Sequence, residues 1–218
     1  MEFYDVRMWF VKQGDLKYIS HLDLQRFMQR ALKRSGLPLW HTEGFNPHPY
    51  VTFALPLSLG QESLCEMVDF RLTKSMSVHA VKSAMERVMP YDMRVLAVAQ
   101  PIAKAKMIAY ADYTVCFHGW TDQLDRVTDF LCQPNISVVK RTKKGGESVV
   151  NLAEVMQEVS VTAQNDKLQI YLRLPAGSTV NVNPSLLVQA LEQALGQSPY
   201  GAAITRTAVR TADGNIFS

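Results

Sequence analysis

The sequence has no closely spaced pair of cysteines. Its three cysteines, Cys65, Cys116 and Cys132, lie far apart and stand among apolar neighbours. A cysteine zinc site, a disulfide framework and an iron–sulfur cluster all need several cysteines at defined spacings, so none of them is supported in this chain. We expect three buried free thiols in a reducing, cytoplasmic environment.

Long apolar runs and a strong net charge are also missing. No stretch approaches the roughly 18 apolar residues of a membrane-spanning helix, and residues 1–18 interrupt their apolar side chains with charges, unlike a signal peptide. The formal net charge is +3, the isoelectric point is near 8.7, and 47% of the residues are hydrophobic. This composition predicts a globular core, and it permits an anionic partner without requiring one.

Nucleotide-binding motifs do not occur either. The sequence contains neither the Gly-x-x-x-x-Gly-Lys-Ser/Thr phosphate loop nor the Gly-x-Gly-x-x-Gly dinucleotide fingerprint. His21, His41 and His48 match no familiar zinc spacing. We therefore predict no metal site and no bound cofactor.

The first hundred residues predict the order strand, helix, strand, strand, helix, strand. The clearest element is a helix that begins after Ser20 and ends at Gly36, with apolar residues at helical spacing between them. Strands are expected at residues 3–11, 50–55, 64–72 and 94–99, and a second helix after Ser77. This is the order of the split βαβ, ferredoxin-like fold.

After a linker at residues 101–106, a similar order returns with one extra hairpin. The expected elements are strands at residues 109–117, 136–141, 148–152, 159–163, 168–174 and 203–209, a helix capped by Thr121, and a helix opened by Pro184. We therefore predict an α+β protein of two tandem ferredoxin-like units, residues 1–100 and 107–218. Their sheets would be mainly antiparallel, with helices on one face.

The segment Gly44–Pro49, with the sequence GFNPHP, is expected to be stiff. Its two prolines fix φ and push the residues before them toward extended conformations. Phe45, Asn46 and His48 would then be presented from a rigid backbone near the start of the first helix. A stacking ring and an amide suit single-stranded RNA. The alternative is that Phe45 fills the local core and the prolines only shape the connection.

His21 lies in the first turn of the first predicted helix, where free N–H groups and the helix dipole favour anions. Its imidazole could act as an acid or a base near neutral pH. With His48, and with Arg26 nearby, it could cleave RNA without a metal. The alternative is that His21 and Asp23 only belong to the helix cap.

Positive charge gathers at three places in the sequence. One face of the first helix carries Arg26, Arg30, Lys33 and Arg34; a predicted hairpin turn carries Lys140, Arg141, Lys143 and Lys144; and the last strand carries Arg206 and Arg210. These side chains could neutralise RNA phosphates. The alternative is that they form solvated surfaces and protect an exposed strand edge.

Three segments carry a resemblance to a known family. YISHLDLQRFMQRALKRSGLPL (residues 18–39), EGFNPHPYVTFALPLSLGQES (residues 43–63) and VKRTKKGG (residues 139–146) resemble the bacterial radical-SAM-linked domain of unknown function. The resemblance implies a partner, a radical SAM protein supplied by another chain or by fusion. It implies no reaction. This sequence has no CxxxCxxC motif to hold the partner's cluster itself.

The leading hypothesis is an RNA-binding accessory module for a partner radical SAM protein, acting in RNA modification or processing. Its RNA could be tRNA or rRNA. The candidate binding residues are Arg26, Arg30, Phe45, Asn46, His48, Lys140, Arg141, Lys143, Lys144 and Arg206, and the candidate catalytic residues are His21 and His48. Two alternatives stay open, a metal-independent RNA-cleaving enzyme and a protein-interaction scaffold without RNA. A non-catalytic role is favoured.

Overall fold

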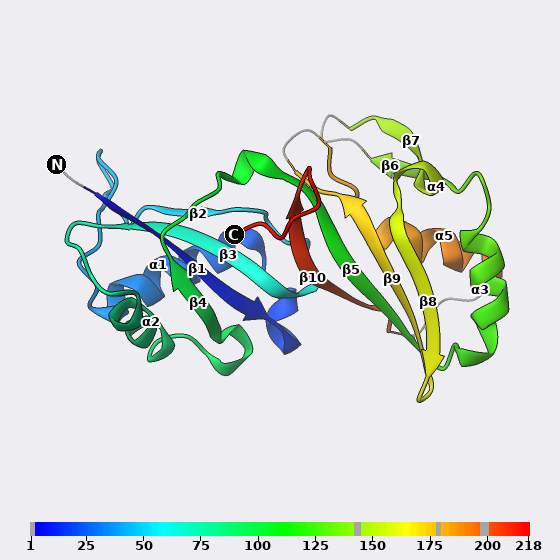
Figure 1. The fold of residues 1–218 in the computed structure, drawn as a ribbon, viewed down its shortest axis with the longest axis horizontal. Helices are drawn as coiled ribbons and strands as arrows, with labels where there is room; N and C mark the ends of the chain where they lie inside the picture. Colours follow the sequence, from blue (N-terminus) through cyan, green and yellow to red (C-terminus); the bar gives the residue numbers. More distant parts are fainter. Residues whose placement is uncertain (1–2, 142–144, 178–179, 197–200) are drawn as a thin grey trace. The chain divides into compact units, whose positions relative to one another are not determined.

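The computed structural model describes residues 3–141, 145–177, 180–196 and 201–218. Lys143 and Lys144 therefore lie outside the described residues, and so does the side chain of Arg141. The chain divides into two units (Figure 1). Unit 1 comprises Met1–Ile108 and Ile216–Ser218, and unit 2 comprises Ala109–Asn215. The fold is mixed α+β, with mainly antiparallel strand pairing.

Unit 1 is an antiparallel sheet with two helices on one face (Figure 1). Its elements are β1 (Tyr4–Lys12), η1 (Gly14–Tyr18), α1 (His21–Ser35), β2 (Val51–Phe53), β3 (Glu62–Leu72), α2 (Val78–Glu86), η2 (Tyr91–Met93), β4 (Val95–Ala99) and η3 (Ala105–Met107). The strands lie in the order β4-β1-β3-β2, with all three pairings antiparallel. The last strand therefore pairs with the first, and the third strand separates the first from the second.

The core of unit 1 explains why alternate residues of its strands are apolar. Val6, Met8 and Phe10 of β1 and Val68 and Phe70 of β3 face the helices and are at most 8% exposed. Because strand side chains alternate between faces, this register leaves the odd-numbered positions on the opposite face. Both helices pack on the same apolar layer.

Helix α1 forms as its sequence predicts. The hydroxyl of Ser20 accepts a hydrogen bond from the backbone N–H of Asp23 (3.1 Å), which satisfies one of the free donors of the first turn. Leu24, Met28 and Leu32 lie on the buried side at no more than 3% exposure. The helix ends at Gly36, whose φ of 75° is the left-handed conformation that glycine adopts without strain.

The sheet face of unit 1 opposite the helices carries a buried ion pair. Arg7 of β1 donates two hydrogen bonds to the carboxylate of Asp69 on β3 (2.7 and 2.8 Å) and one to the carbonyl oxygen of Ala103 (3.0 Å). The ring of Phe217 lies 4.7 Å from the guanidinium carbon. Arg7 is 1% exposed, and within the described residues its Nη1 atom has no hydrogen-bond partner.

Unit 2 has a second antiparallel arrangement with an additional hairpin. Its elements are β5 (Ile108–His118), η4 (Thr121–Gln123), α3 (Leu124–Leu131), β6 (Ser137–Arg141), β7 (Glu147–Asn151), α4 (Leu152–Val155), β8 (Gln157–Gln164), β9 (Lys167–Pro175), α5 (Ser185–Leu195) and β10 (Ala203–Thr211). Its sheet has the order β10-β5-β9-β8, and β6 and β7 form a separate two-stranded sheet. Asn165 and Asp166 turn the β8–β9 hairpin with positive φ angles of 51° and 58°.

Some expectations need correction. Thr121 does not cap a helix: it begins η4, and Gln123 occupies the cap position of α3 without a side-chain hydrogen bond. Helix α4 was not expected, since a four-residue helix leaves no periodic pattern. The three cysteines are free, but Cys132 is exposed and the other two are half-buried rather than buried. Among the described helices, none has the length and apolar character to cross a membrane.

Candidate functional site

The exposed face of α1 is basic. Arg26, Lys33 and Arg34 each lie three or four residues from Arg30. All four are exposed, because the opposite face of the helix packs on the core. Arg26 contacts Asp23 at 3.4 Å, and both side chains are 60% exposed, so this pair is weak. We call Arg26, Arg30 and Lys33 the α1 basic face.

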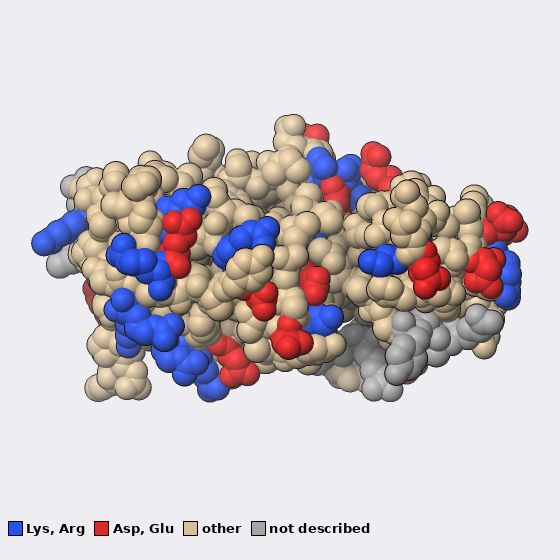
Figure 2. Space-filling model, turned by 90° about the horizontal axis from the view of Figure 1, so that it is seen from below, with Lys and Arg blue, Asp and Glu red and all other residues tan. Residues whose placement is uncertain are grey.

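The α1 basic face surrounds a hollow. Arg26, Gln29, Arg30 and Lys33 line a shallow cavity of about 180 Å³. In Figure 2, Lys and Arg side chains gather over the helices of unit 1, on the left part of the face that is shown. Three cations around one hollow repel one another, and a bound anion would relieve that repulsion. Arg26 and Arg30, two of the predicted binding residues, are brought together here.

The Gly44–Pro49 loop is the tip of an irregular hairpin. Its stem is held by hydrogen bonds from the N–H of Tyr50 to the carbonyl of Trp40 (3.2 Å) and from the N–H of Thr42 to the carbonyl of His48 (2.8 Å). The stem is attached to β3 through the N–H of Trp40, which donates to the carbonyl of Arg71 (2.9 Å). The loop is therefore anchored at the end of β3.

The three predicted loop residues are on the surface. Phe45 is fully exposed, at 104%, so the alternative in which it fills the local core is wrong. Asn46 and His48 are exposed as well. The Nδ1 atom of His48 lies 3.0 Å from the carbonyl oxygen of Asn46 and 3.2 Å from the hydroxyl of Thr42, and these contacts fix the imidazole on the hairpin. The loop presents these side chains outward from a hydrogen-bonded stem.

An arginine among aromatic rings lies at the base of this hairpin. The guanidinium carbon of Arg71 is 4.6 Å from the ring centre of Tyr50, 5.6 Å from that of Trp40 and 5.7 Å from that of Phe3. The Nε atom of Arg71 donates a hydrogen bond to the carboxylate of Asp5 (2.7 Å), and this bond raises the pKa of the Arg71 guanidinium. We call Phe3, Trp40, Tyr50 and Arg71 the Arg71 cluster. Sequence reasoning missed it.

His21 and His48 are not brought together. The ring of His21 packs edge-on against Phe53 of β2, with ring centres 5.1 Å apart. His48 precedes Phe53 by five residues of mostly extended chain, which span roughly 16 Å. The loop therefore lies at the β1-start end of the sheet, beside Phe3, and not beside the start of α1 as expected. A pair of histidines acting on one phosphate needs them within a few ångströms of the same atoms.

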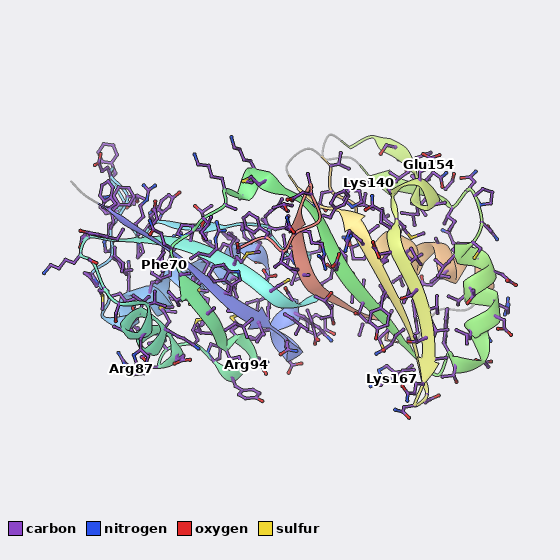
Figure 3. The ribbon with its side chains drawn as sticks, in the orientation of Figure 1. Phe70, Arg87, Arg94, Lys140, Glu154 and Lys167 are labelled. Carbon is purple, nitrogen blue, oxygen red and sulfur yellow. The ribbon has the colours of Figure 1, made fainter. Side chains whose placement is uncertain are left out.

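The predicted basic residues of unit 2 lie in different surroundings. Lys140 of β6 donates from Nζ to the carbonyl oxygen of Asn181 (2.6 Å) and is labelled in Figure 3. Arg210 is bonded to Asp112 (2.6 Å) and to the carbonyl oxygen of Gly214 (2.8 Å). Arg206 is 2% exposed, so the prediction that it extends an RNA-facing surface is corrected. Its position on β10 directs its side chain away from solvent. The spacing of Arg206 and Arg210 in the sequence does not show which face of the strand is buried.

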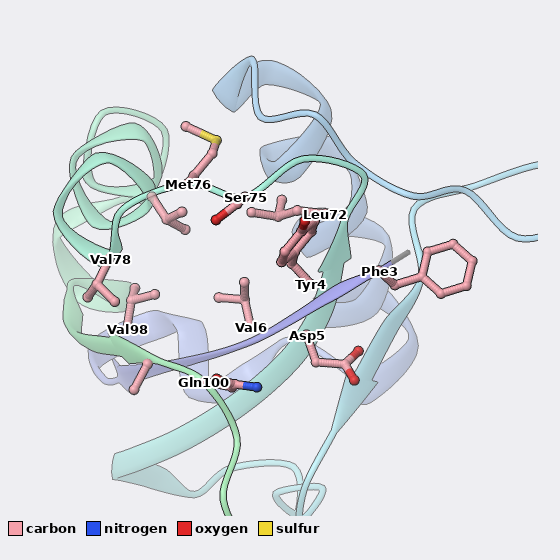
Figure 4. A pocket seen from close by; sticks show the side chains of 12 residues that line it. Phe3, Tyr4, Asp5, Val6, Leu72, Ser75, Met76, Val78, Val98 and Gln100 are labelled. Atoms are coloured by element: carbon pink, nitrogen blue, oxygen red, sulfur yellow. The ribbon is translucent and has the colours of Figure 1, made fainter. Parts of the chain in front are cut away.

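A further pocket lies between α2 and the sheet of unit 1. It has a volume of about 480 Å³, and its lining includes both aliphatic residues, such as Val6 and Val98, and polar residues, such as Ser75 and Gln100. In Figure 4 the side chains of Phe3 and Asp5 point away from it. The described residues also contain no group of three or more His, Cys, Asp or Glu side chains that could hold a metal ion. The pocket combines polar and apolar surface.

The matching family covers most of both units. The profile of the family described as "Uncharacterized protein conserved in bacteria (DUF2344)" matches residues 5–184. The chain belongs to the DUF2344 family. The matched part of this DUF2344 protein contains the α1 basic face, the Gly44–Pro49 loop and three members of the Arg71 cluster, Trp40, Tyr50 and Arg71. The description states no reaction and no partner.

Other comparisons add little. No curated protein matches the sequence. Among solved structures, the chain is similar to one in "Crystal Structure of a Cbf5-Nop10-Gar1 Complex", with 10% sequence identity and a TM-score of 0.48. That similarity covers 96% of this DUF2344 chain and 50% of the other chain, so this chain spans about half the length of its structural neighbour. A similarity of this degree carries no argument about function.

Proposed function

We propose that this DUF2344 protein is a cytoplasmic RNA-binding accessory module that works with a radical SAM protein in RNA modification or processing. The observation that carries the RNA-binding part is the α1 basic face. Arg26, Arg30 and Lys33 line one hollow, and Asp23 forms a weak ion pair with Arg26. tRNA and rRNA are the candidate ligands.

The charge arrangement suits a phosphate backbone. Arginine presents several donors in a planar fork that matches phosphate oxygens, and lysine adds a point charge. Contacts of this kind release counterions, so the logarithm of the binding constant falls by about 0.7 for each neutralised phosphate of a single strand per tenfold increase in salt. Three contacted phosphates give a slope of about −2.

The test is a titration of labelled RNA by fluorescence anisotropy at several salt concentrations. The wild-type protein should bind at low salt and weaken as salt rises. The triple variant Arg26→Gln, Arg30→Gln, Lys33→Gln should bind more weakly and should reduce the magnitude of the salt slope by about 2, because it removes the three phosphate contacts.

A charge-matched control removes three cations from other places. Lys82 lies in α2, Arg87 directly follows α2, and Lys167 is the first residue of β9. Arg87 and Lys167 are labelled in Figure 3. The variant with Gln at these three positions should keep the wild-type slope. Equal losses in both triple variants would mean that only net charge matters, and the proposal for α1 would then be abandoned.

The partner and the fold type belong to the same proposal. The sequence resemblance supports a radical SAM partner, and the strand order of unit 1, with the last strand beside the first, supports ferredoxin-like units. The corresponding order β10-β5-β9-β8 supports the same reading of unit 2.

Co-purification of a radical SAM protein with the tagged full chain tests the partner. Loss of that protein on nuclease treatment would show that RNA, rather than a direct contact, joins the two.

A protein-interaction scaffold is a second candidate function. The specific observation in its favour is Phe45, which is fully exposed at the tip of a rigid hairpin. Exposed aromatic side chains are common anchors of protein interfaces. The variant Phe45→Ser should then lose a partner protein that the wild type retains in high salt and after nuclease treatment. The two-histidine cleavage alternative lacks such an observation, since His21 and His48 are held at separate places.

A further inference from the structure

The rings of the Arg71 cluster meet edge to face. Phe3 and Trp40 have ring centres 5.2 Å apart, and Trp40 and Tyr50 have ring centres 5.8 Å apart, both at an interplanar angle of 62°. Rings in this geometry do not stack on each other's faces. The contrast within the same chain is Phe117 and Trp120, which stack at 13° and are 0% and 6% exposed, as core residues do.

The Arg71 cluster also stays open to solvent. Phe3 is 39% exposed, 32% of the Arg71 side chain is exposed, and Trp40 and Tyr50 are half-buried. A cluster that only braced the hairpin would be expected to bury its rings, since burial of aromatic surface is what stabilises it. Part of the surface of this cluster therefore remains available to a ligand.

The cluster is ordered before any ligand arrives. Asp5 holds the Arg71 guanidinium at 2.7 Å, and Trp40 and Tyr50 are fixed by the hydrogen bonds of the hairpin stem. The same face of the hairpin continues toward the tip with His48 and Thr42, because side chains two residues apart in an extended strand share a face. A ligand would lose little affinity to ordering these groups.

The chemistry selects the class of ligand. Aromatic rings alone could hold a cation, but the guanidinium of Arg71 already occupies that place, 4.6 Å from the ring centre of Tyr50, with Asp5 as its counter-ion. A flat, uncharged ring can stack on this cluster without displacing Arg71 or its ion pair with Asp5. We propose that the Arg71 cluster is a stacking site for an unpaired nucleobase, so that the RNA bound by this protein is single-stranded at this place. The inference rests on the proposed RNA-binding function.

The experiment compares three probes of equal length by fluorescence anisotropy: a single-stranded RNA, the same single strand with abasic residues, and an RNA duplex. Stacking on an aromatic side chain contributes about 1–3 kcal/mol per base, so the single strand should bind about tenfold more tightly than the abasic strand. Tyr50→Leu and Trp40→Leu should each lose about that factor with the single strand and nothing with the abasic strand.

Two variants separate stacking from loss of structure. Tyr50→Phe keeps the ring and should retain the wild-type affinity, which shows that the hairpin tolerates change at this position. Tyr91→Leu removes an 83% exposed ring on η2 and should change nothing. Far-UV circular dichroism of each variant confirms that the chain is folded.

The outcomes distinguish this inference from the proposed function. If the α1 triple variant weakens all probes while the abasic strand binds as well as the RNA strand, the stacking site is refuted and RNA binding stands. If Tyr50→Leu changes only the capture of a partner protein, the cluster is a protein contact and the inference is wrong. If the wild type binds none of the probes at low salt, both proposals are wrong.

Discussion

Removing Asp69 should be a strongly damaging change on the face of the unit 1 sheet opposite the helices. The variant Asp69→Ala leaves Arg7 1% exposed, without its two carboxylate hydrogen bonds and with an Nη1 atom that already lacks a partner among the described residues. Removing one member of a buried ion pair typically destabilises a protein by about 3–5 kcal/mol.

The structure places the expected value at the low end of that range. Asp69 is 24% exposed, so water can enter the space that its carboxylate leaves, and the bond from Arg7 to Ala103 remains. We therefore expect a loss of about 3 kcal/mol in the free energy of unfolding of unit 1. For a unit of this size the midpoint of thermal unfolding should fall by about 12 °C, at about 4 °C for each kcal/mol.

Native-state amide hydrogen exchange is the most direct assay, because β1 pairs with β3 and β4 of unit 1, so its amides report on unit 1. Asp5→Ala is the matched control: its ion pair with Arg71 has the same 2.7 Å distance, but the side chains are 50% and 32% exposed, so the loss should be no more than about 1 kcal/mol. The double variant Arg7→Met, Asp69→Leu should recover most of the stability. Equal losses at Asp69 and Asp5, or a double variant no better than Asp69→Ala, would refute the reasoning.

Three further predictions concern local features. Ser20→Ala removes the cap of α1 and should reduce stability by about 1 kcal/mol in urea denaturation, whereas Ser20→Asp should retain it. Met28→Ala leaves a cavity at a fully buried position and should cost about 2–5 kcal/mol in the same measurement. Hydrogen bonds from Thr211 and Asn215 lower the pKa of Asp213 below its ordinary 3.8. The stability that these hydrogen bonds contribute is therefore present above pH 3.8 and is lost as the pH falls through the lowered pKa. Thr211→Val should move the carboxyl titration, followed by NMR, back toward the ordinary value.

Local sequence signals predicted the elements better than the site. Helix α1 was predictable because its cap residue, the spacing of its apolar residues and Gly36 all indicate the same helix. Its basic residues are excluded from the side that packs on the core, so they must lie together on the other side. The Arg71 cluster was not predictable, since residues 3, 40, 50 and 71 meet only through the register of β1 with β3 and the hydrogen bond from Trp40 to Arg71. The position of the loop was misjudged for the same reason: proline and glycine indicate its stiffness, but strand pairing decides which end of the sheet it occupies.

The tail that covers Arg7 affects how the protein can be divided for experiments. In the sequence, unit 2 lies between two segments of unit 1, which end at Ile108 and resume at Ile216, so unit 2 is an insertion in unit 1. A fragment cut after Ile108 loses Phe217, the ring that lies 4.7 Å from the buried guanidinium. Any shortened form meant to keep this contact must retain residues 216–218.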